Sequence, residues 1–382
     1  MNVERRIKQH LKAPVLFFKA NAHIGFESTL ASELSILGIS QCEAQSGVVH
    51  FNAKLEKVWQ AIALSRCARN IEMRIAQFHC ENFGKLEHEI KNIAWELYLP
   101  QNCNLSVKAF SEKSRLYHKG AVEERAKEII QKHFQNSKNP ENLASGKRLH
   151  IRFKNDVCSI WLDLCGPALH KRGERWVEEA PMQETLAASI LLYANFAKYE
   201  KLIDPMAGSG VFSLEAARWR CNSNLKLMRN FDFMEMPSFR EAAFNNFLQK
   251  AKQPFALADG EKFEILCSDN NPKAIKTIRH NLHAHLNAVS ISQADFFSLP
   301  SEQNALLVLN PPYGKRLGRE KGLYKEIAKK IEKDFSKCKA IILCPSKEAP
   351  KAEDTIQTYN GGLKTAVIIA SFQTNYFWEL YT

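Results

Sequence analysis

The chain has 382 residues, of which 45% are hydrophobic and 25% are charged. This composition excludes a disordered or collagen-like chain, and the length predicts two or three domains. No apolar run approaches the ~18–20 residues that span a bilayer. The apolar stretch after Pro14 is interrupted at Lys19, which does not indicate a secretory signal, so we expect a cytoplasmic protein.

Charge and cysteine content narrow the class of partner. Lys and Arg number 53 against 41 Asp and Glu, and the net charge of +12 favours a polyanionic partner such as RNA or DNA. The ten cysteines contain no Cys-x-x-Cys pair, which argues against a disulfide framework and against a zinc site. We therefore expect reduced thiols and no metal centre.

The first part of the chain, up to about residue 168, predicts an α+β arrangement with small sheets. A helix over 25–38 has Leu30, Leu34 and Leu37 at helical spacing, and a hairpin over 148–166 turns at Asn155–Asp156. The other expected strands are 15–20, 47–51, 71–80 and 104–110, and the other expected helices are 55–69, 83–95 and 120–134.

The second part alternates strands with helices and predicts a doubly wound parallel sheet, whose ligands bind at the carboxyl ends of the strands. The expected helices are 182–196, 211–219, 271–285 and 323–335. The expected strands are 201–204, 263–269, 289–295, 305–313, 339–344, 365–372 and 375–382.

A glycine turn over 204–210 follows the first of these strands. Gly208 and Gly210 allow a sharp turn and a close approach of the backbone to a ligand, and the next helix presents its amide groups to an electronegative atom. The turn is not a P-loop, because no Lys-Ser/Thr follows it. It is also a poor dinucleotide fingerprint, since Ser213 stands at the third glycine position. A plain glycine-containing turn is the alternative.

Two aspartates follow the next two strands. Asp269 is placed to accept the ribose hydroxyls of an adenosine; the alternative is a helix N-cap by Asp269 or Asn270. Asp295 is placed to accept the amino group of adenine, with Phe296 as an apolar neighbour of the ring. A solvated turn aspartate is the alternative for Asp295.

The motif Asn310-Pro311-Pro312-Tyr313 ends the strand over 305–310 and is the sharpest signal. The prolines fix the backbone, so the Pro311 carbonyl and the Asn310 amide oxygen form two fixed acceptors. Two acceptors and a stacking ring suit an exocyclic amine on a planar base, because accepting both N–H protons lets the nitrogen lone pair attack an electrophilic methyl group. Stacking on Tyr313 contributes about 1–3 kcal/mol. A plain Pro-Pro turn is the alternative.

These motifs resemble those of class I S-adenosylmethionine-dependent methyltransferases that act on exocyclic amines. More narrowly, the chain resembles the THUMP-domain RNA guanine-N2 methyltransferases. The matching stretches are DPMAGSG at 204–210, LEAA at 214–217, SD at 268–269, NPPYGKRLG at 310–318, LHKRGER at 169–175, APMQETLAA at 180–188 and NGG at 360–362. The resemblance covers nearly the whole chain; one departure is Val211, where the family commonly has Thr.

The resemblance implies a Rossmann-like methyltransferase domain over 169–382, preceded by a ferredoxin-like segment over 1–70 and a THUMP RNA-binding domain over 71–168. It implies S-adenosylmethionine as cofactor and Asn310, Pro311, Pro312 and Tyr313 as the residues that hold the target amine. The implied cofactor-binding residues are Gln183, Glu184, Thr185, Asp204, Pro205, Gly208, Ser209, Gly210, Asp269, Asn270, Asp295 and Phe296.

Two further segments are interpreted beside this resemblance. The separation of Asp204 and Asp269 exceeds the usual ~20 residues, so 218–264 is expected to be an insertion in which 231–239 provides apolar packing. Lys171, Arg172 and Arg175 are expected to contact RNA phosphates, or else to form an interdomain salt-bridge hinge.

The sequence thus predicts an RNA methyltransferase that methylates the 2-amino group of a guanine in 23S ribosomal RNA. The rivals are guanine-N2 methylation of transfer RNA, N6-adenine methylation of DNA, and a non-catalytic RNA-binding assembly factor. The sequence does not reveal the oligomeric state.

Overall fold

The computed structural model describes residues 3–11, 15–101, 103–134, 144–172, 175–177, 182–220, 229–251, 254, 256–258, 261–312, 322–349 and 355–370. The chain divides into two compact units. The first comprises Met1–Asn21, Ala31–Leu169 and Leu227–Lys250, and the second comprises Ala22–Leu30, His170–Lys226 and Ala251–Thr382.

A seven-stranded sheet organises the first unit, in the order β2-β3-β1-β4-β7-β6-β5. Its strands are β1 (Leu16–Asn21), β2 (Glu43–Gln45), β3 (Val48–Ala53), β4 (Asn70–His79), β5 (Cys103–Glu112), β6 (Ala144–Lys154) and β7 (Val157–Asp163). Only the β5–β6 pair is parallel among the neighbouring strands of this sheet that the structure describes. The prediction of small sheets is wrong, because β4 is long enough to pair with β1 on one side and with β7 on the other.

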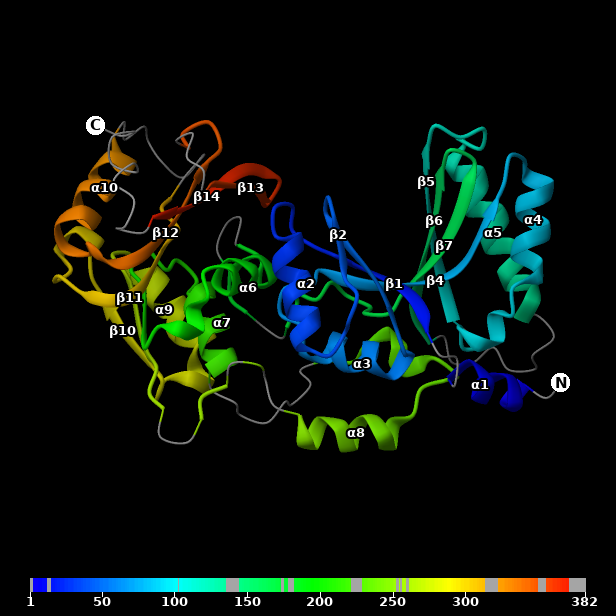
Figure 1. The fold of residues 1–382 in the computed structure, drawn as a ribbon, viewed down its shortest axis with the longest axis horizontal. Helices are drawn as coiled ribbons and strands as arrows, with labels where there is room; N and C mark the ends of the chain where they lie inside the picture. The colour runs from blue at the N-terminus through cyan, green and yellow to red at the C-terminus, as the bar shows by residue number, and fades with distance from the viewer. Residues whose placement is uncertain are drawn as a thin grey trace. The chain divides into compact units, whose positions relative to one another are not determined.

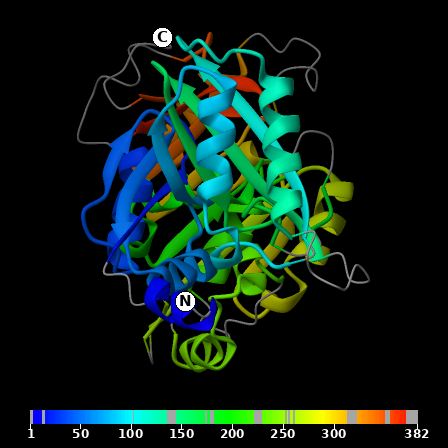
Figure 2. The ribbon, with the colours of Figure 1, turned by 90° about the vertical axis from the view of Figure 1, so that its right-hand side faces the viewer.

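Helices cover one face of this sheet. In Figures 1 and 2, α4 and α5 lie side by side against β5 and β6. The described helices are α1 (Val3–Leu11), α3 (Leu55–Leu64), α4 (Phe83–Asn92), η1 (Trp95–Leu97) and α5 (Lys119–Phe134), with α2 (Glu27–Ile36) divided between the units. Alternate strand residues such as Phe18, Ile151 and Ile160 point toward the helices and are almost fully buried.

The β6–β7 hairpin turns where the sequence predicts. Asn155 and Asp156 have φ values of +50° and +60°. Two successive left-handed residues are what a two-residue type I′ loop requires, and Asn and Asp tolerate that conformation better than most side chains.

Leu227–Lys250, the central part of the expected insertion over 218–264, belongs to the first unit. Its described elements are η3 (Asp232–Glu235) and α8 (Glu241–Lys250). Phe233 is fully buried and stacks on Trp59 with ring centroids 5.8 Å apart, and the rings of Phe239 and Phe244 pack around it. The expected apolar packing of 231–239 is therefore confirmed.

A second seven-stranded sheet organises the second unit, in the order β10-β9-β8-β11-β12-β14-β13. Its strands are β8 (Lys201–Asp204), β9 (Glu264–Asp269), β10 (Val289–Gln293), β11 (Gln303–Leu309), β12 (Lys337–Pro345), β13 (Thr355–Asn360) and β14 (Leu363–Ala370). The first five strands are parallel, but β14 is antiparallel to β12 and β13 to β14. The predicted doubly wound parallel sheet is confirmed for the first five strands, and the edge formed by β14 and β13 departs from it. A tight turn at Gly361–Gly362 joins β13 directly to β14, which makes that pair antiparallel. The strand predicted over 375–382 lies outside the described residues.

Helices flank both faces of the second sheet. Figure 1 shows α6, α7 and α9 on one side and α10 on the other. The described helices are α6 (Glu184–Tyr193), η2 (Phe196–Lys198), α7 (Val211–Arg220), α9 (Pro272–Asn281), η4 (His283–His285), η5 (Phe296–Ser298) and α10 (Leu323–Asp334). The chain runs from β8 outward to β9 and β10, and then returns to the other side of β8 with β11. The order reverses between β8 and β11, which is where open α/β sheets bind ligands.

None of the helices in the described ranges is long and apolar enough to cross a bilayer.

The packing of the insertion is testable with Phe233→Ala. Removing this fully buried ring from its aromatic cluster should lower the free energy of unfolding by about 3–5 kcal/mol. Urea denaturation monitored by tryptophan fluorescence would measure the change. Tyr359→Ala removes a ring that is 42% exposed and serves as the control. Equal stabilities of Phe233→Ala and the control would contradict the packing described.

Candidate functional site

The glycine turn after β8 is attached to the end of β9. The Gly208 amide donates to Asp269 Oδ2 at 2.9 Å, and the Ala207 amide donates to the Ser268 carbonyl at 3.1 Å. Gly208 and Gly210 have φ values of +54° and +73°, a region that side chains with a Cβ rarely adopt. A Cβ added at Gly208 would meet no atom within 4 Å, so the turn leaves open space for a ligand. Pro205 and Ser209 lie in this turn, and helix α7 begins directly after it, at Val211.

Both carboxylate oxygens of Asp269 hold neighbouring backbone amides. Its Oδ1 accepts from the Asn271 amide at 2.9 Å, and its Oδ2 holds Gly208. Each carboxylate oxygen accepts more than one hydrogen bond, so both remain available to a ligand hydroxyl. The suggested N-cap by Asp269 or Asn270 is wrong: Asn271 caps α9, accepting from the Lys273 amide at 2.9 Å. Asn270 is exposed, and its carbonyl accepts from Gln293 at 3.3 Å.

Asp204 ends β8 as a fully buried carboxylate. Its Oδ2 accepts from Ser213 Oγ at 2.8 Å and from the Ser213 amide at 3.2 Å. Its Oδ1 has no hydrogen-bond partner among the described residues. Burial raises the pKa of Asp204 to about 7, although the bonds from Ser213 oppose the shift. Ser213, which departs from the dinucleotide fingerprint, thus provides the hydroxyl that holds Asp204.

Asp295 lies beside Asp269, because the Ala294 amide donates to the Asp269 carbonyl at 3.1 Å. Asp295 is exposed and caps η5, with its Oδ1 accepting from the Phe297 amide at 2.9 Å. The Phe296 ring is only 2% exposed and stacks in the core on Phe335, with ring centroids 5.8 Å apart. This placement argues against the predicted contact of the Phe296 ring with adenine; the neighbouring Phe297 ring is 37% exposed.

Asn310 follows β11, the strand that pairs with β8 through Leu307 and Ile203. The amide oxygen of Asn310 is buried and has no hydrogen-bond partner among the described residues. A buried acceptor without a donor is costly, so this atom is available for an N–H group of a ligand. Pro311 is buried and Pro312 is exposed. Tyr313 lies outside the described residues.

The segment predicted to close over the cofactor begins α6. Glu184 is buried with its Oε1 3.3 Å from Arg175 Nε, and Thr185 Oγ1 lies 2.9 Å from His23 Nε2. Burial raises the pKa of Glu184, and the charge of Arg175 opposes the shift. Both side chains are therefore engaged inside the protein. Gln183 differs, because its Oε1 is buried without a partner in the described part of the chain.

The basic segment before α6 is mostly engaged in internal ion pairs. Arg172 Nη1 lies 2.9 Å from Oε2 of the fully buried Glu215 on α7, and Arg218 Nη1 lies 3.0 Å from the other oxygen. Arg175 is buried and donates to the Met182 carbonyl at 2.9 Å. Because carboxylates already pair with Arg172 and Arg175, this geometry argues against the phosphate contacts predicted for these two residues. Both carboxylates belong to the second unit, as the arginines do, so these ion pairs are not the predicted interdomain hinge. Lys171 is exposed.

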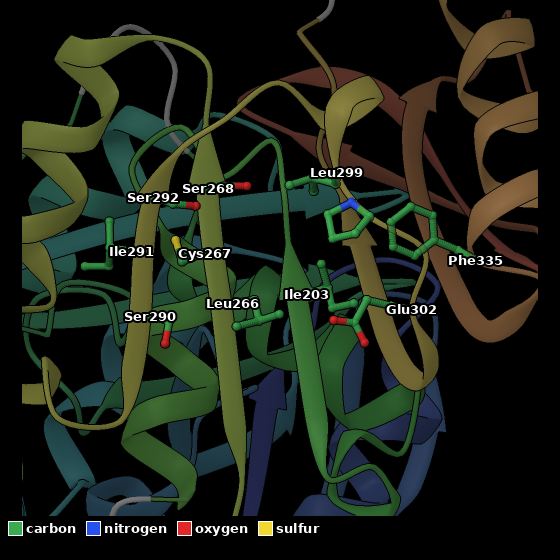
Figure 3. A pocket seen from close by; sticks show the side chains of 11 residues that line it. Ile203, Leu266, Cys267, Ser268, Ser290, Ile291, Ser292, Leu299, Glu302 and Phe335 are labelled. Atoms are coloured by element: carbon green, nitrogen blue, oxygen red, sulfur yellow. The ribbon is translucent and has the colours of Figure 1, made fainter.

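A pocket of about 150 Å³ lies between the strands β8, β9 and β10 and the segment over 299–302 (Figure 3). Apolar side chains including Ile203, Leu266, Leu299 and Phe335 line it, with Ser268 and Ser292 as polar groups. It forms where η5, rather than a full helix, connects β10 to β11. None of the predicted site residues lines this pocket.

Within the described ranges, no group of three or more His, Cys, Asp or Glu residues is arranged to hold a metal ion.

Comparisons with known proteins agree with this architecture. Residues 172–358 match the RMKL-like methyltransferase domain, and residues 18–71 match the RlmL ferredoxin-like domain. The ribosomal RNA large subunit methyltransferase K/L of Syntrophotalea carbinolica is 30% identical over 383 residues, which cover 94% of this chain and 54% of that protein. The protein of the same name from Shewanella baltica is 26% identical with the same coverage. The chain therefore spans about half the length of these curated relatives.

Solved structures extend the comparison. SMU.472, assigned as a methyltransferase and crystallised with SAH, is 27% identical with a TM-score of 0.80, over 94% of this chain and 99% of that one. TrmN from Thermus thermophilus is 18% identical with a TM-score of 0.67, over 93% of this chain and 98% of that one, and shares the fold.

The buried carboxyl group of Asp204 predicts a pH dependence of stability that Asp204→Asn should remove. Its pKa of about 7 in the folded protein exceeds the ~3.9 of an unfolded chain, so the carboxyl group stabilises the fold most below about pH 4. This contribution is lost as the pH rises to about 7, by at most roughly 4 kcal/mol. Urea denaturation between pH 4 and 8 would measure it.

Asp295→Asn is the matched control, because Asp295 is exposed and Asn caps a helical turn equally well. The control should follow the wild-type pH profile. An Asp204→Asn profile as steep as that of the wild type would contradict the assignment.

Proposed function

The chain belongs to the family that joins an RlmL ferredoxin-like domain to an RMKL-like methyltransferase domain, and from this premise we propose that it methylates RNA. The proposed reaction transfers the methyl group of S-adenosylmethionine to the 2-amino group of a guanine in 23S ribosomal RNA. The names of the curated relatives support the RNA class. We also propose that the protein is cytoplasmic, because that is where it would meet ribosomal RNA.

The carrying observation is the hydrogen bond between Gly208, in the turn after β8, and Asp269 at the end of β9, next to the point where the strand order reverses. It brings an open glycine turn and a carboxylate together at one edge of the sheet. In this proposal Gly208, Ser209 and Gly210 border the methionine end of the cofactor, Asp269 accepts its ribose hydroxyls, and Asp295 accepts the adenine amino group. Pro205 and Asn270 lie next to these residues in the sequence. Gln183 is proposed to offer its unpartnered amide oxygen to the cofactor.

The cofactor fits the residues present. The open space before Gly208 admits a ligand close to the backbone, and both Asp269 oxygens keep acceptor capacity. When bound, S-adenosylmethionine supplies an electrophilic methyl group on a sulfonium.

The protein's own contribution lies with Asn310 and the prolines after it. The buried, unpartnered Oδ1 of Asn310 accepts one N–H of the guanine amine, and the Pro311 carbonyl accepts the other. The nitrogen lone pair is then withdrawn from the ring and directed at the methyl carbon. Positioning supplies most of the rate in such a transfer, and the base leaves its stack to reach the site. Tyr313 is proposed to stack on that base.

The N-terminal part supports an RNA substrate over DNA. Residues 18–71 match the RlmL ferredoxin-like domain. We assign 1–70 to this segment, 71–168 to a THUMP domain, and 169–382 to the methyltransferase domain with the insertion over 218–264. Transfer RNA as substrate remains the second candidate, since its guanine presents the same amine.

Asn310→Ala should separate cofactor binding from turnover. The variant loses an acceptor for the amine but no cofactor contact, so its affinity for S-adenosylmethionine should be unchanged while methyl transfer falls about 10²–10³-fold. Calorimetric titration and radiolabelled methyl transfer to ribosomal RNA would measure the two effects. Gln303→Ala, at the other end of β11, is the control. Full activity of Asn310→Ala would refute the assigned role.

The substrate is tested by mass spectrometry of nucleosides from cells with and without the protein. Loss of N2-methylguanosine from 23S ribosomal RNA is expected. Loss from transfer RNA alone would identify the second candidate, and unchanged nucleosides in both RNAs would overturn the proposed activity.

A further inference from the structure

The face of the first sheet opposite its core carries charged and aromatic side chains. Alternation along the strands places Phe17 and Lys19 of β1, Arg74 of β4, Trp161 of β7, and Arg152 of β6 on this face. The neighbouring residues Phe18, Ile160 and Ile151 point the other way and are buried in the core. We name this face, with Lys108 and Phe110 of β5, the polar face of the sheet.

Five aromatic rings form a row across the polar face. His50 on β3 stacks on Phe17 with centroids 5.6 Å apart, and Phe17 lies 5.9 Å from Trp161. His150 is directly opposite Trp161 in the β6–β7 register, and Phe110 on β5 lies 6.0 Å from His150. With neighbouring strands ~4.8 Å apart, a row from β3 to β5 extends roughly 24 Å.

Two arginines are stacked on rings of this row. The Arg74 guanidinium lies 3.9 Å from the Phe17 centroid, and the Arg152 guanidinium lies 4.5 Å from the Phe110 centroid. Neither arginine has a carboxylate partner among the described residues, and Arg152 Nε is buried without a hydrogen bond. Each guanidinium therefore lies against a ring, and no carboxylate neutralises its charge within the described part of the protein.

The charges at the centre of the row are compensated, which sets them apart from these arginines. Lys19 is buried 3.0 Å from Glu72, which also contacts His150 at 3.1 Å, and Arg148 lies 3.1 Å from Asp163. Burial would raise the pKa of Glu72, but its bonds to His150 and Lys19 lower it to about 2. The charged side chains at the centre of the row therefore neutralise one another. The net positive charge of the polar face lies with the two stacked arginines.

We propose that the polar face of this sheet binds a single-stranded segment of RNA, whose bases stack on Phe110 and on the guanidinium groups of Arg74 and Arg152. Trp161 is only 5% exposed, so it packs within the row and does not itself stack on a base. The inference rests on the proposed function, because RNA is the polyanion that the activity requires. It adds a binding site in the first unit to the candidate cofactor site in the second.

Single-stranded RNA fits this face better than a duplex does. Unpaired bases stack on aromatic rings and on guanidinium planes, whereas an A-form duplex presents phosphates and 2′-hydroxyls. Phe110 is 42% exposed, so a stacking surface is accessible at the β5 edge. The Lys108 side chain is 64% exposed and its Nζ lies 3.9 Å from Glu123, a long, solvated ion pair that leaves the ammonium accessible to a phosphate. Electrostatic attraction to the phosphates makes such binding weaken with added salt.

Fluorescence anisotropy with the whole protein, without cofactor, tests the proposal. The probes are a labelled single strand of about 12 nucleotides and a duplex of the same length. The single strand should bind more tightly than the duplex, and Phe110→Ala and Arg152→Gln should each weaken single-strand binding roughly tenfold. Circular dichroism would confirm that both variants keep their fold.

Two matched controls lie in the second unit. Tyr359→Ala removes a ring with the same 42% exposure, and Lys333→Gln removes one exposed cation from α10. Both should bind the single strand as the wild type does. The proposal is overturned if Phe110→Ala and Arg152→Gln bind like the wild type, if the controls weaken binding equally, or if the duplex binds more tightly than the single strand.

The same samples separate this proposal from the proposed activity. Calorimetric titration with S-adenosylmethionine reports only on the second unit and should be identical in all variants. Methyl transfer by the wild type together with unaltered single-strand binding by the variants would refute the RNA face alone. If the variants bind the single strand more weakly but the wild type transfers no methyl group to any RNA, the proposed activity alone is refuted.

Discussion

The hydrogen bond from the Gly208 amide to Asp269 Oδ2 fixes the geometry on which the candidate site depends. It ties the turn after β8 to the end of β9, and the Ala294 amide ties the segment after β10 to the same residue. The loops after β8 and β10 thereby meet at one residue at the end of β9, the first through the side chain of Asp269 and the second through its backbone carbonyl. Asn310 reaches the same edge because β11 pairs with β8 on its other side.

Buried polar groups without partners mark this edge more clearly than any cavity does. Asp204 Oδ1, Gln183 Oε1 and Asn310 Oδ1 are buried acceptors without a donor among the described residues. An unsatisfied buried acceptor costs roughly 1–3 kcal/mol. The two that follow the paired strands β8 and β11, on Asp204 and Asn310, therefore call for an explanation. A ligand that supplies N–H groups there is the explanation this account offers.

The local sequence was sufficient to predict those elements whose structure is determined by neighbouring residues. Strand β8 matches its predicted bounds, because a short apolar run ends at a proline. The turn at Asn155–Asp156 is similarly encoded by two residues that tolerate left-handed conformations. The fold of the second unit and the position of its loops followed from such signals.

Long-range partners were what the sequence did not reveal. The sequence predicts that Arg172 contacts phosphate, but in the structure it pairs with Glu215, which is 43 residues later in the sequence. The sequence predicts that the Phe296 ring contacts adenine, but in the structure this ring stacks on Phe335 in the core. The single sheet of the first unit depends on the pairing of β4 with β1 and β7, and neither pairing has a local signature. The stacked arginines of the polar face were missed for the same reason, since each ring lies on a neighbouring strand.

The central claim is that the Gly208 turn and Asp269 hold the cofactor. An X-ray structure of the complex with S-adenosylhomocysteine tests it most directly. The account predicts the ribose hydroxyls within hydrogen-bonding distance of Asp269 and the amino-acid end along the Gly208–Gly210 turn. Ligand density in the pocket of Figure 3, with Asp269 making no contact to it, would contradict the account.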